Sequence, residues 1–391
     1  MRPDERALWL ALTLLCVFVQ DSKSVLKIKV GFLAPWTNVD VLDNFSGPTS
    51  AGALNIAIDF IKENMNLVED VDFEIFTRDS ACDSKQAGGY MVELHVEERV
   101  DVVIGPPCSI ACVTAAQLAS FWNIPIISWV ATDPDFNDKK IYTTLGRTLG
   151  PFSKLGIFLN DILSSYGWTR VVVISSTFLL YSDAGKAFIK VFNENNVTIA
   201  YQVAYDKNPT VRRVRNILLK TKAEGRIIFI CAPKNDRRTF LLEASSLGMT
   251  NGDYVYYTVE MLPDEAVVTA EETYLGNDDR NEEARQAFGS VFHVSLAALS
   301  GKEIDDFTVE VARRLQDEPW NLTLQEGVKG NKYAAFLHDA LLVYAVALNE
   351  TVSLGNDYRD GEVMLQAMAG KFLKAWDADF NVETAIAYTV R

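Results

Sequence analysis

Few residues in this sequence are arranged in a way that could perform chemistry. The 391 residues include five cysteines and three histidines, and none of the cysteines form a C-x-x-C pair. A zinc site would therefore have almost no ligands to draw on. The chain contains no G-x-S-x-G, no G-x-x-x-x-G-K-[ST], and no G-x-G-x-x-G after its first strand. We expect no catalytic residues, no metal and no cofactor, and hence a protein that is not an enzyme.

Asparagine sequons and cysteines instead suggest export. An apolar run of twelve residues, 8–19, follows a charged start and precedes the small residues Ser22 and Ser24. It is shorter than the roughly 20 residues that span a bilayer and is typical of a signal peptide, which we place at residues 1–24. Four N-x-[ST] sequons predict glycosylation at Asn44, Asn196, Asn321 and Asn349.

The predicted location is the extracellular side of the plasma membrane, or the medium as a secreted protein. No second apolar stretch of 18 residues is present, so a membrane would be reached only through a segment absent from this sequence. The net charge of −15 repels phosphates and argues against nucleic acid as a partner.

Strand-like and helix-like segments alternate along the chain after residue 26. Short apolar runs such as 124–128 (IPIIS), 170–175 (RVVVIS) and 226–231 (RIIFIC) are separated by segments with helical periodicity. This alternation is typical of βαβ units around a parallel sheet, and the pattern restarts after Leu145. The predicted fold is α/β, with two doubly wound parallel-sheet lobes and a cleft at the carboxyl ends of their strands.

The lobe boundaries follow from where the pattern breaks. The acidic stretch 262–283 has little periodicity and is interpreted as a crossing segment and surface loop. We expect residues 25–145 with about 284–360 to form the outer lobe. Residues 146–262 with about 361–391 would form the second lobe.

Residues at predicted strand ends are the candidates for lining the cleft. Trp36 and Trp129 could give a ligand large contact areas, although packing inside the protein would explain them equally well. Ser175, Ser176 and Thr177 could bind a small ligand through their hydroxyls, although the same run suits an ordinary strand-to-helix turn. Phe178 and Glu260 follow strands in the same way.

Several motifs, taken together in order, resemble the extracellular domains of natriuretic peptide receptors and receptor guanylate cyclases. They occur between about residues 27 and 368. The matching segments are 105–108 (GPPC), 122–125 (WNIP), 142–156 (YTTLGRTLGPFSKLG), 167–168 (GW), 225–231 (GRIIFIC) and 252–255 (GDYV). The resemblance implies a type I periplasmic-binding-protein-like fold, an extracellular peptide hormone or small ligand as partner, and a homodimer. Any guanylate cyclase activity would lie in a C-terminal region absent from this chain.

The resemblance also implies roles for single residues. It pairs Cys82 with Cys108 in a disulfide, and a loop of that length stabilises the fold by roughly 3–4 kcal/mol. Asp83 and Phe136 match hormone-contact positions of the family, although a structural role would explain each of them equally well.

Other positions depart from the family. Ile110 and Gln117 replace an aromatic residue and an arginine, and Ile141 replaces an acidic residue, which predicts weak binding of mammalian-type natriuretic peptides. Pro107 has no N–H to offer at the family's chloride site.

The main hypothesis is therefore a receptor-type ligand-binding domain that signals occupancy by rearrangement of its lobes or its dimer. The alternatives are an amino-acid-binding ectodomain of a class C or glutamate-type receptor, and a secreted soluble decoy. A cysteine-rich segment and seven membrane helices in the adjoining coding sequence would favour the class C alternative.

Overall fold

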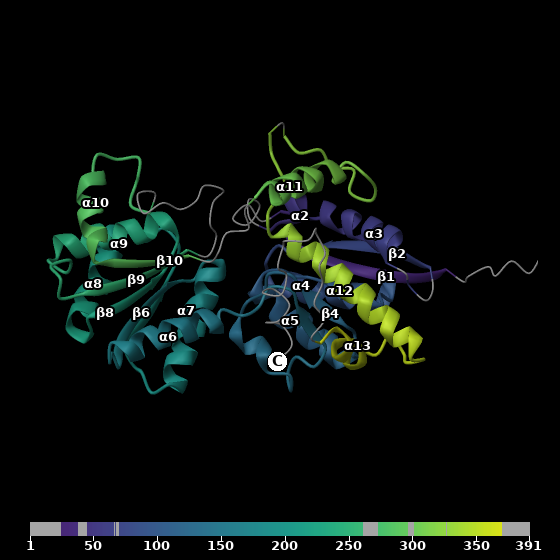
Figure 1. Ribbon diagram of the computed structural model, residues 1–391, viewed down its shortest axis with the longest axis horizontal. Helices are drawn as coiled ribbons and strands as arrows, with labels where there is room; N and C mark the ends of the chain where they lie inside the picture. The colour runs from purple at the N-terminus through teal and green to yellow at the C-terminus, as the bar shows by residue number, and fades with distance from the viewer. Residues whose placement is uncertain are drawn as a thin grey trace, which may run out of the picture.

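Two α/β lobes lie side by side along the longest axis of the molecule (Figure 1). The computed structural model describes residues 25–37, 45–65, 67, 70–260, 273–295, 301–325 and 327–369. The predicted signal peptide, Asn44 and the last 22 residues of the chain fall outside these ranges.

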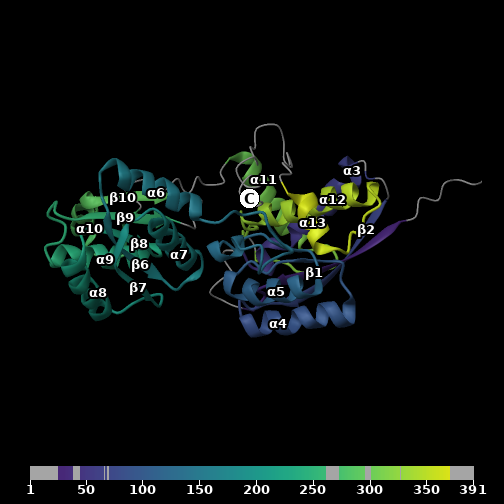
Figure 2. The same cartoon turned by 90° about the horizontal axis from the view of Figure 1, so that it is seen from below.

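The first lobe is built on a five-stranded parallel sheet in the order β2-β1-β3-β4-β5. Its strands are β1 Leu26–Ala34, β2 Val71–Asp79, β3 Val102–Ile104, β4 Ile126–Ser128 and β5 Leu145–Arg147. Helices α4 (Ser84–Glu93) and α5 (Ser109–Trp122) cover one face of the sheet, and α3 (Gly52–Asn64) and α12 (Ala334–Ser353) cover the other (Figure 2). The short helix α2 (Gly47–Ser50) and the longer α11 (Lys302–Arg314) pack near α3, and α13 (Gly361–Met368) packs on α12.

The second lobe repeats this plan with the strand order β10-β9-β8-β6-β7, again fully parallel. Its strands are β6 Arg170–Ser176, β7 Thr198–Tyr205, β8 Ile227–Cys231, β9 Val255–Glu260 and β10 Val291–Ser295. Its helices are α6 Ser153–Ser165, α7 Leu179–Glu194, α8 Val211–Glu224, α9 Lys234–Ser246 and α10 Asn281–Ala287. The predicted fold of two doubly wound lobes is confirmed.

Alternate residues of a strand serve opposite helical layers, because successive side chains point to opposite faces of a sheet. In β6, Val171 and Val173 pack in the cluster that contains Phe188 and Phe192 of α7, whereas Val172 and Ile174 pack in the cluster formed with α8 and α9. Both faces are covered, which explains why this strand reads as an uninterrupted apolar run.

The structure corrects the expected lobe boundaries in two places. Strand β10 was expected in the outer lobe, but it pairs with β9 in the second sheet, and α10 packs on α9. Helix α13 was expected in the second lobe, but it contacts α12 and β5 in the first. The described residues on both sides of the stretch 261–272 therefore belong to the second lobe.

Helix α12 was not anticipated as an apolar segment of membrane-spanning length. Its 20 residues are long and apolar enough to cross a bilayer, but 67% of its most apolar window is buried inside the protein. It packs on α3 and α13 and its residues Leu337, Leu341 and Tyr344 are at most 1% exposed. This burial is what a core helix of the first lobe requires.

Candidate functional site

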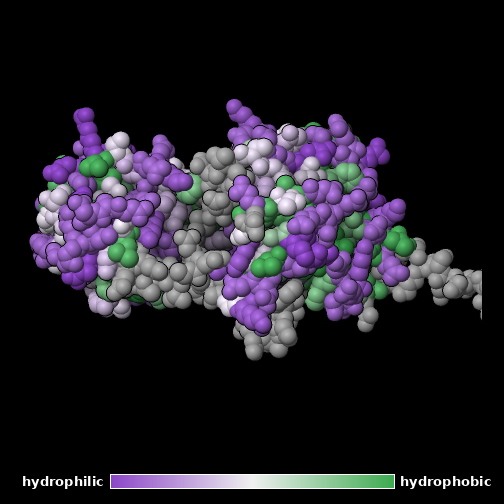
Figure 3. Space-filling view, turned by 90° about the horizontal axis from the view of Figure 1, so that it is seen from above, coloured by the Kyte–Doolittle hydropathy of each residue, from purple (hydrophilic) through white to green (hydrophobic). Residues whose placement is uncertain are grey.

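The candidate site lies where the carboxyl ends of the second lobe's strands face the first lobe. The surface of both lobes is mainly hydrophilic in the view of Figure 3, with apolar residues scattered singly or in small groups. In open α/β sheets, ligands bind beyond the carboxyl ends of the strands. The polar side chains that the structure gathers there form two groups, both of which include residues from the first two turns of α7.

The first group, which we call the edge cluster, consists of Tyr181, Arg237 and Glu260. Glu260 ends β9 and accepts hydrogen bonds from the Tyr181 hydroxyl at 2.6 Å and from the Arg237 guanidinium. Arg237 also donates to the carbonyls of Ala232 (3.0 Å) and Val259 (2.6 Å), so α9 is tied to the ends of β8 and β9.

The edge cluster is almost fully removed from water. Arg237 is 1% exposed, Tyr181 3% and Glu260 7%. Burial, and after it the charge of Glu260, raises the pKa of Tyr181 well above its ordinary value, so this hydroxyl stays a donor. Burial also lowers the pKa of nearby His293 to about 4, which keeps that imidazole neutral at physiological pH.

The second group, which we call the interlobe contact, joins α7 to the first lobe. Asp183 of α7 accepts hydrogen bonds from the hydroxyls of Ser109 (2.6 Å) and Thr132 (2.8 Å). Lys186, one turn further along α7, pairs with Asp133 at 2.5 Å. A helix of one lobe is thus held by charge and hydrogen bonds against the other.

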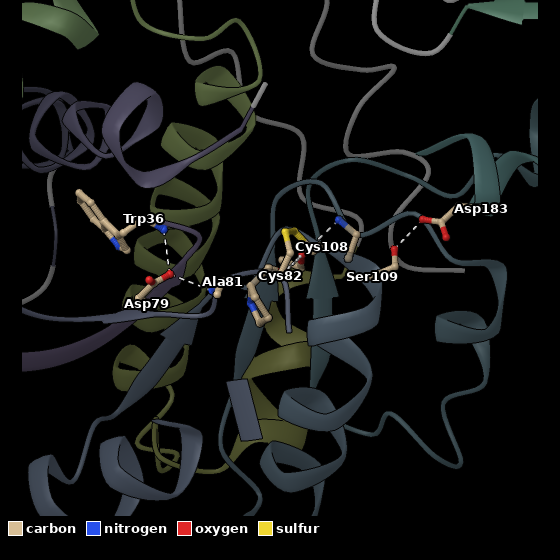
Figure 4. Close-up of a disulfide and its surroundings, with 10 residues drawn as sticks. Trp36, Asp79, Ala81, Cys82, Cys108, Ser109 and Asp183 are labelled. Atoms are coloured by element: carbon tan, nitrogen blue, oxygen red, sulfur yellow. Dashed lines mark hydrogen bonds between the residues drawn. A yellow bond between two sulfur atoms is a disulfide. The ribbon is translucent and has the colours of Figure 1, made fainter. Parts of the chain in front are cut away.

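The disulfide fixes the first-lobe side of this contact. Cys82 and Cys108 are joined, with their Cα atoms 5.4 Å apart, and Ser109 follows directly as the first residue of α5. Figure 4 shows Ser109 turned from the disulfide toward Asp183. Cys112 and Cys231 are free and buried, and burial raises the pKa of each thiol, that of Cys112 to about 12. The predicted disulfide is confirmed.

The two tryptophans proposed for the cleft belong to the first lobe. Trp129 is fully buried and stacks on Phe32 at 5.6 Å between ring centroids, which favours the interior-packing explanation. Trp36 is partly exposed, stacks on Trp320 at 6.0 Å, and donates its backbone N–H to Asp79 at 2.8 Å (Figure 4). Asp79 also accepts from the N–H of Ala81, next to the disulfide.

The side chains of Ser175, Ser176 and Thr177, at the end of β6, make their contacts within the second lobe. Ser176 accepts the N–H of Phe178 at 3.2 Å and Thr177 donates to Asp206 at 3.1 Å, both within the second lobe. The ring of Phe178 lies 4.0 Å below the ammonium group of Lys207. Ser175 lies beside Gly185 of α7, where an added Cβ would come within 2.6 Å of the serine side chain. These contacts match the strand-to-helix turn more closely than a ligand cradle.

Of the five candidate hormone-contact positions taken from the family resemblance, Phe136 is buried and the other four are exposed. Asp83 caps α4 by accepting the N–H groups of Lys85 and Gln86, and Phe136 is fully buried against Tyr142. On the surface lie Ile110 (64% exposed), Ile141 (49% exposed) and Gln117. Among the sequons in the described residues, Asn196 and Asn321 are exposed and Asn349 is partly exposed in α12.

Sequence reasoning missed Ser109, Thr132 and Asp183 as interacting residues. One signal for Asp183 was present: it lies within the apolar stripe of α7, three residues after Leu180 and four before Ala187, both of which are buried. A carboxylate inside such a stripe must find hydrogen-bond donors on another element. The sequence could not identify them, because they lie 74 and 51 residues away.

Comparison with known proteins gives consistent results. Residues 49–375 match the family model described as receptor family ligand binding region. Guanylate cyclase 2G of Rattus norvegicus is 26% identical over 366 residues, which cover 92% of this chain and 32% of that protein. Receptor-type guanylate cyclase gcy-20 of Caenorhabditis elegans is 28% identical over 378 residues, covering 89% and 33%. Atrial natriuretic peptide receptor 3 of Homo sapiens is 26% identical over 302 residues, covering 75% and 54%. The chain spans about a third of the length of the two cyclases.

Proposed function

Because the chain belongs to the family of receptor ligand-binding regions, we propose that it binds an extracellular ligand on behalf of a receptor resembling the membrane guanylate cyclases. The match over residues 49–375 carries this proposal. The part of the cyclases that this chain does not cover would contain any catalytic domain. The chain itself then acts by binding, and its lobes or its dimer rearrange when the ligand is present.

The ligand class that the relatives suggest is a peptide hormone. One relative is named as a receptor for atrial natriuretic peptide, and that name describes the relative alone. In this chain, Ile110, Gln117 and Ile141 present two aliphatic groups and an amide where the family carries an aromatic, a cationic and an acidic group. We therefore propose a peptide of a different sequence, bound beside or between the lobes.

A thermal-shift experiment with the full chain, secreted from cultured animal cells, tests the ligand class. The probes are atrial natriuretic peptide, a set of other secreted peptide hormones, and the twenty amino acids. A ligand present at 100 times its dissociation constant stabilises the folded state by about 2.7 kcal/mol, which raises the unfolding midpoint measurably. We expect stabilisation by a member of the peptide set. Stabilisation by an amino acid instead would replace the proposal with the small-molecule alternative, and turnover of any substrate would refute it.

We further propose that two copies of this chain associate through the outer face of α4 and α5. Three large apolar side chains are exposed there: Val92 (42%), Val96 (61%) and Phe121 (81%). Val96 lies in the π-helical turn Leu94–Glu98 that continues α4, and these helices form the outer layer of the first lobe (Figure 2). Exposed apolar groups gathered on one face are typical of protein interfaces.

Sedimentation equilibrium tests this association. Phe121→Asp should shift the full chain from dimer to monomer, because it places a charge in an apolar interface. Leu219→Asp is the matched control: Leu219 is 50% exposed on α8 of the second lobe, so this variant should keep the wild-type mass. A wild-type chain that is monomeric at micromolar concentration would contradict the proposal.

A further inference from the structure

Asp183 is an acidic residue that the second lobe inserts into the first. It lies in the second turn of α7 and is 4% exposed. Its Oδ2 atom accepts both hydroxyl hydrogen bonds of the interlobe contact, from Ser109 and Thr132. Ser109 Oγ in turn accepts the backbone N–H groups of Thr132 (3.2 Å) and Asp133 (3.3 Å). The Ser109 hydroxyl is therefore oriented toward Asp183 by the first lobe's own backbone.

Separation of the lobes would break this arrangement. Both donors belong to the first lobe and the acceptor belongs to the second, so the hydrogen bonds persist only while α7 stays against α5. The Lys186–Asp133 pair crosses the same boundary, and Lys190 lies 3.6 Å from Asp135 beside it. The Lys190–Asp135 pair contributes little to holding the lobes together, because its side chains are 44% and 73% exposed.

We propose that Asp183, Ser109 and Thr132 form a proton-sensitive latch that holds the two lobes together more tightly in acid than at neutral pH. The latch works without any ligand. It therefore goes beyond the proposed function, and it can fail or succeed independently of which ligand the chain binds.

The sign of the effect follows from the burial of Asp183. Burial raises the pKa of this carboxyl from 3.8 to about 6; the Ser109 and Thr132 hydrogen bonds oppose this rise and the neighbouring Asp133 adds to it. When the lobes separate, water reaches the carboxyl and its pKa returns toward the ordinary value. The latched state therefore binds more protons between these two pKa values, and acid favours it.

The other charged or titratable groups near Asp183 do not reverse this sign. They are Lys186 on α7, Cys112 on α5, Arg147 on β5, and Asp133 at the start of the 3-10 turn 134–137. Burial lowers the pKa of Arg147 only to about 10, so this cation stays charged between pH 5 and 7. Burial alone would lower the pKa of Lys186, but Asp133 raises it above its ordinary value. The Cys112 thiol keeps its proton.

The latch makes a quantitative prediction for the population of separated lobes. With pKa values of about 6 when latched and 3.8 when separated, the ratio of latched to separated molecules rises roughly ninefold between pH 7 and pH 5. In Asp183→Asn the side chain is uncharged at every pH, so this rise should disappear. In the double variant Ser109→Ala/Thr132→Val the donors are lost, so separated molecules should increase at pH 7.

Distances between spin labels measure the populations directly. Cysteines replacing Glu63 on α3 and Arg212 on α8, both exposed, place one label on each lobe. Labelled full-length chain is mixed with an excess of unlabelled chain so that only distances within one molecule are recorded. The matched control is Glu194→Gln, which makes the same carboxylate-to-amide change at an exposed position of α7.

Three results together support the latch. The wild-type chain and Glu194→Gln shift toward the short distance as the pH falls from 7 to 5, Asp183→Asn does not shift, and the double variant has more of the long distance at pH 7. An equal acid response in Asp183→Asn and wild type overturns the role of the proton. An unchanged distance distribution in the double variant overturns the latch, even if Asp183→Asn fails to fold.

Discussion

Removing the charge of Glu260 should destabilise the second lobe strongly, because it leaves Arg237 buried without its counter-charge. Arg237 is 1% exposed, and its NH1 group is already committed to the Ala232 and Val259 carbonyls, so it cannot turn toward water. Breaking a buried ion pair by removing one partner costs about 3–5 kcal/mol. We expect Glu260→Gln to lower the free energy of unfolding by an amount in this range.

Two further variants locate the source of the loss. Tyr181→Phe removes a hydrogen bond to a charged acceptor and should cost about 1.5–3 kcal/mol. The double variant Arg237→Met/Glu260→Leu removes both charges and should recover most of the loss, because apolar replacements of a buried pair are often neutral. A cost that persisted in the double variant would come from packing, or from the Tyr181 hydroxyl and the Ala232 and Val259 carbonyls left without partners, and not from the unpaired charge.

Urea-induced unfolding followed by circular dichroism provides these free energies. The control is Glu224→Gln, since Glu224 pairs with Arg170 at 3.3 Å on the surface, with side chains 38% and 55% exposed. An exposed pair of this kind contributes about 0–1 kcal/mol. If Glu260→Gln cost no more than Glu224→Gln, the reasoning from burial would be refuted.

The remaining predictions concern the first lobe. Replacing Cys82 and Cys108 together by alanine should lower the free energy of unfolding by about 3.5 kcal/mol, the loop-closure value for a separation of 26 residues; a loss below about 1 kcal/mol would contradict it. Chloride should leave the thermal midpoint close to that in gluconate at equal ionic strength, because Pro107 cannot donate at the family's chloride position. A large chloride-specific rise in the midpoint would show that other donors bind the ion.

The sheets could be predicted from the sequence because buried parallel strands appear as short, uninterrupted apolar runs. The run 226–231 corresponds to β8 at Ile227–Cys231, and 170–175 corresponds to β6 at Arg170–Ser176. The lobe to which β10 belongs could not be predicted from the sequence in the same way. The apolar run of β10 would suit an edge position in either sheet, and only its pairing with β9 decides between them.

The polar groups at the site were harder to predict, for a different reason. Glu260 was identified because it ends a strand, but its partner Arg237 lies inside α9, where an arginine ordinarily marks an exposed face. Its burial depends on the approach of α9 to the ends of β8 and β9. Such residues become visible only when the tertiary contacts are known.

The position of α7 between the two polar groups links them mechanically. Tyr181 donates to the edge cluster, whereas Asp183 and Lys186, within the next two turns, hold the first lobe. Helix α7 has 16 residues and packs through Phe188 and Phe192 against the second sheet, so we expect it to move as one body. A ligand that displaced Glu260 would therefore draw the N-terminal end of α7 with it and strain the hydrogen bonds of the interlobe contact. Ligand binding at the strand ends and separation of the lobes would then both be coupled to the same movement of α7.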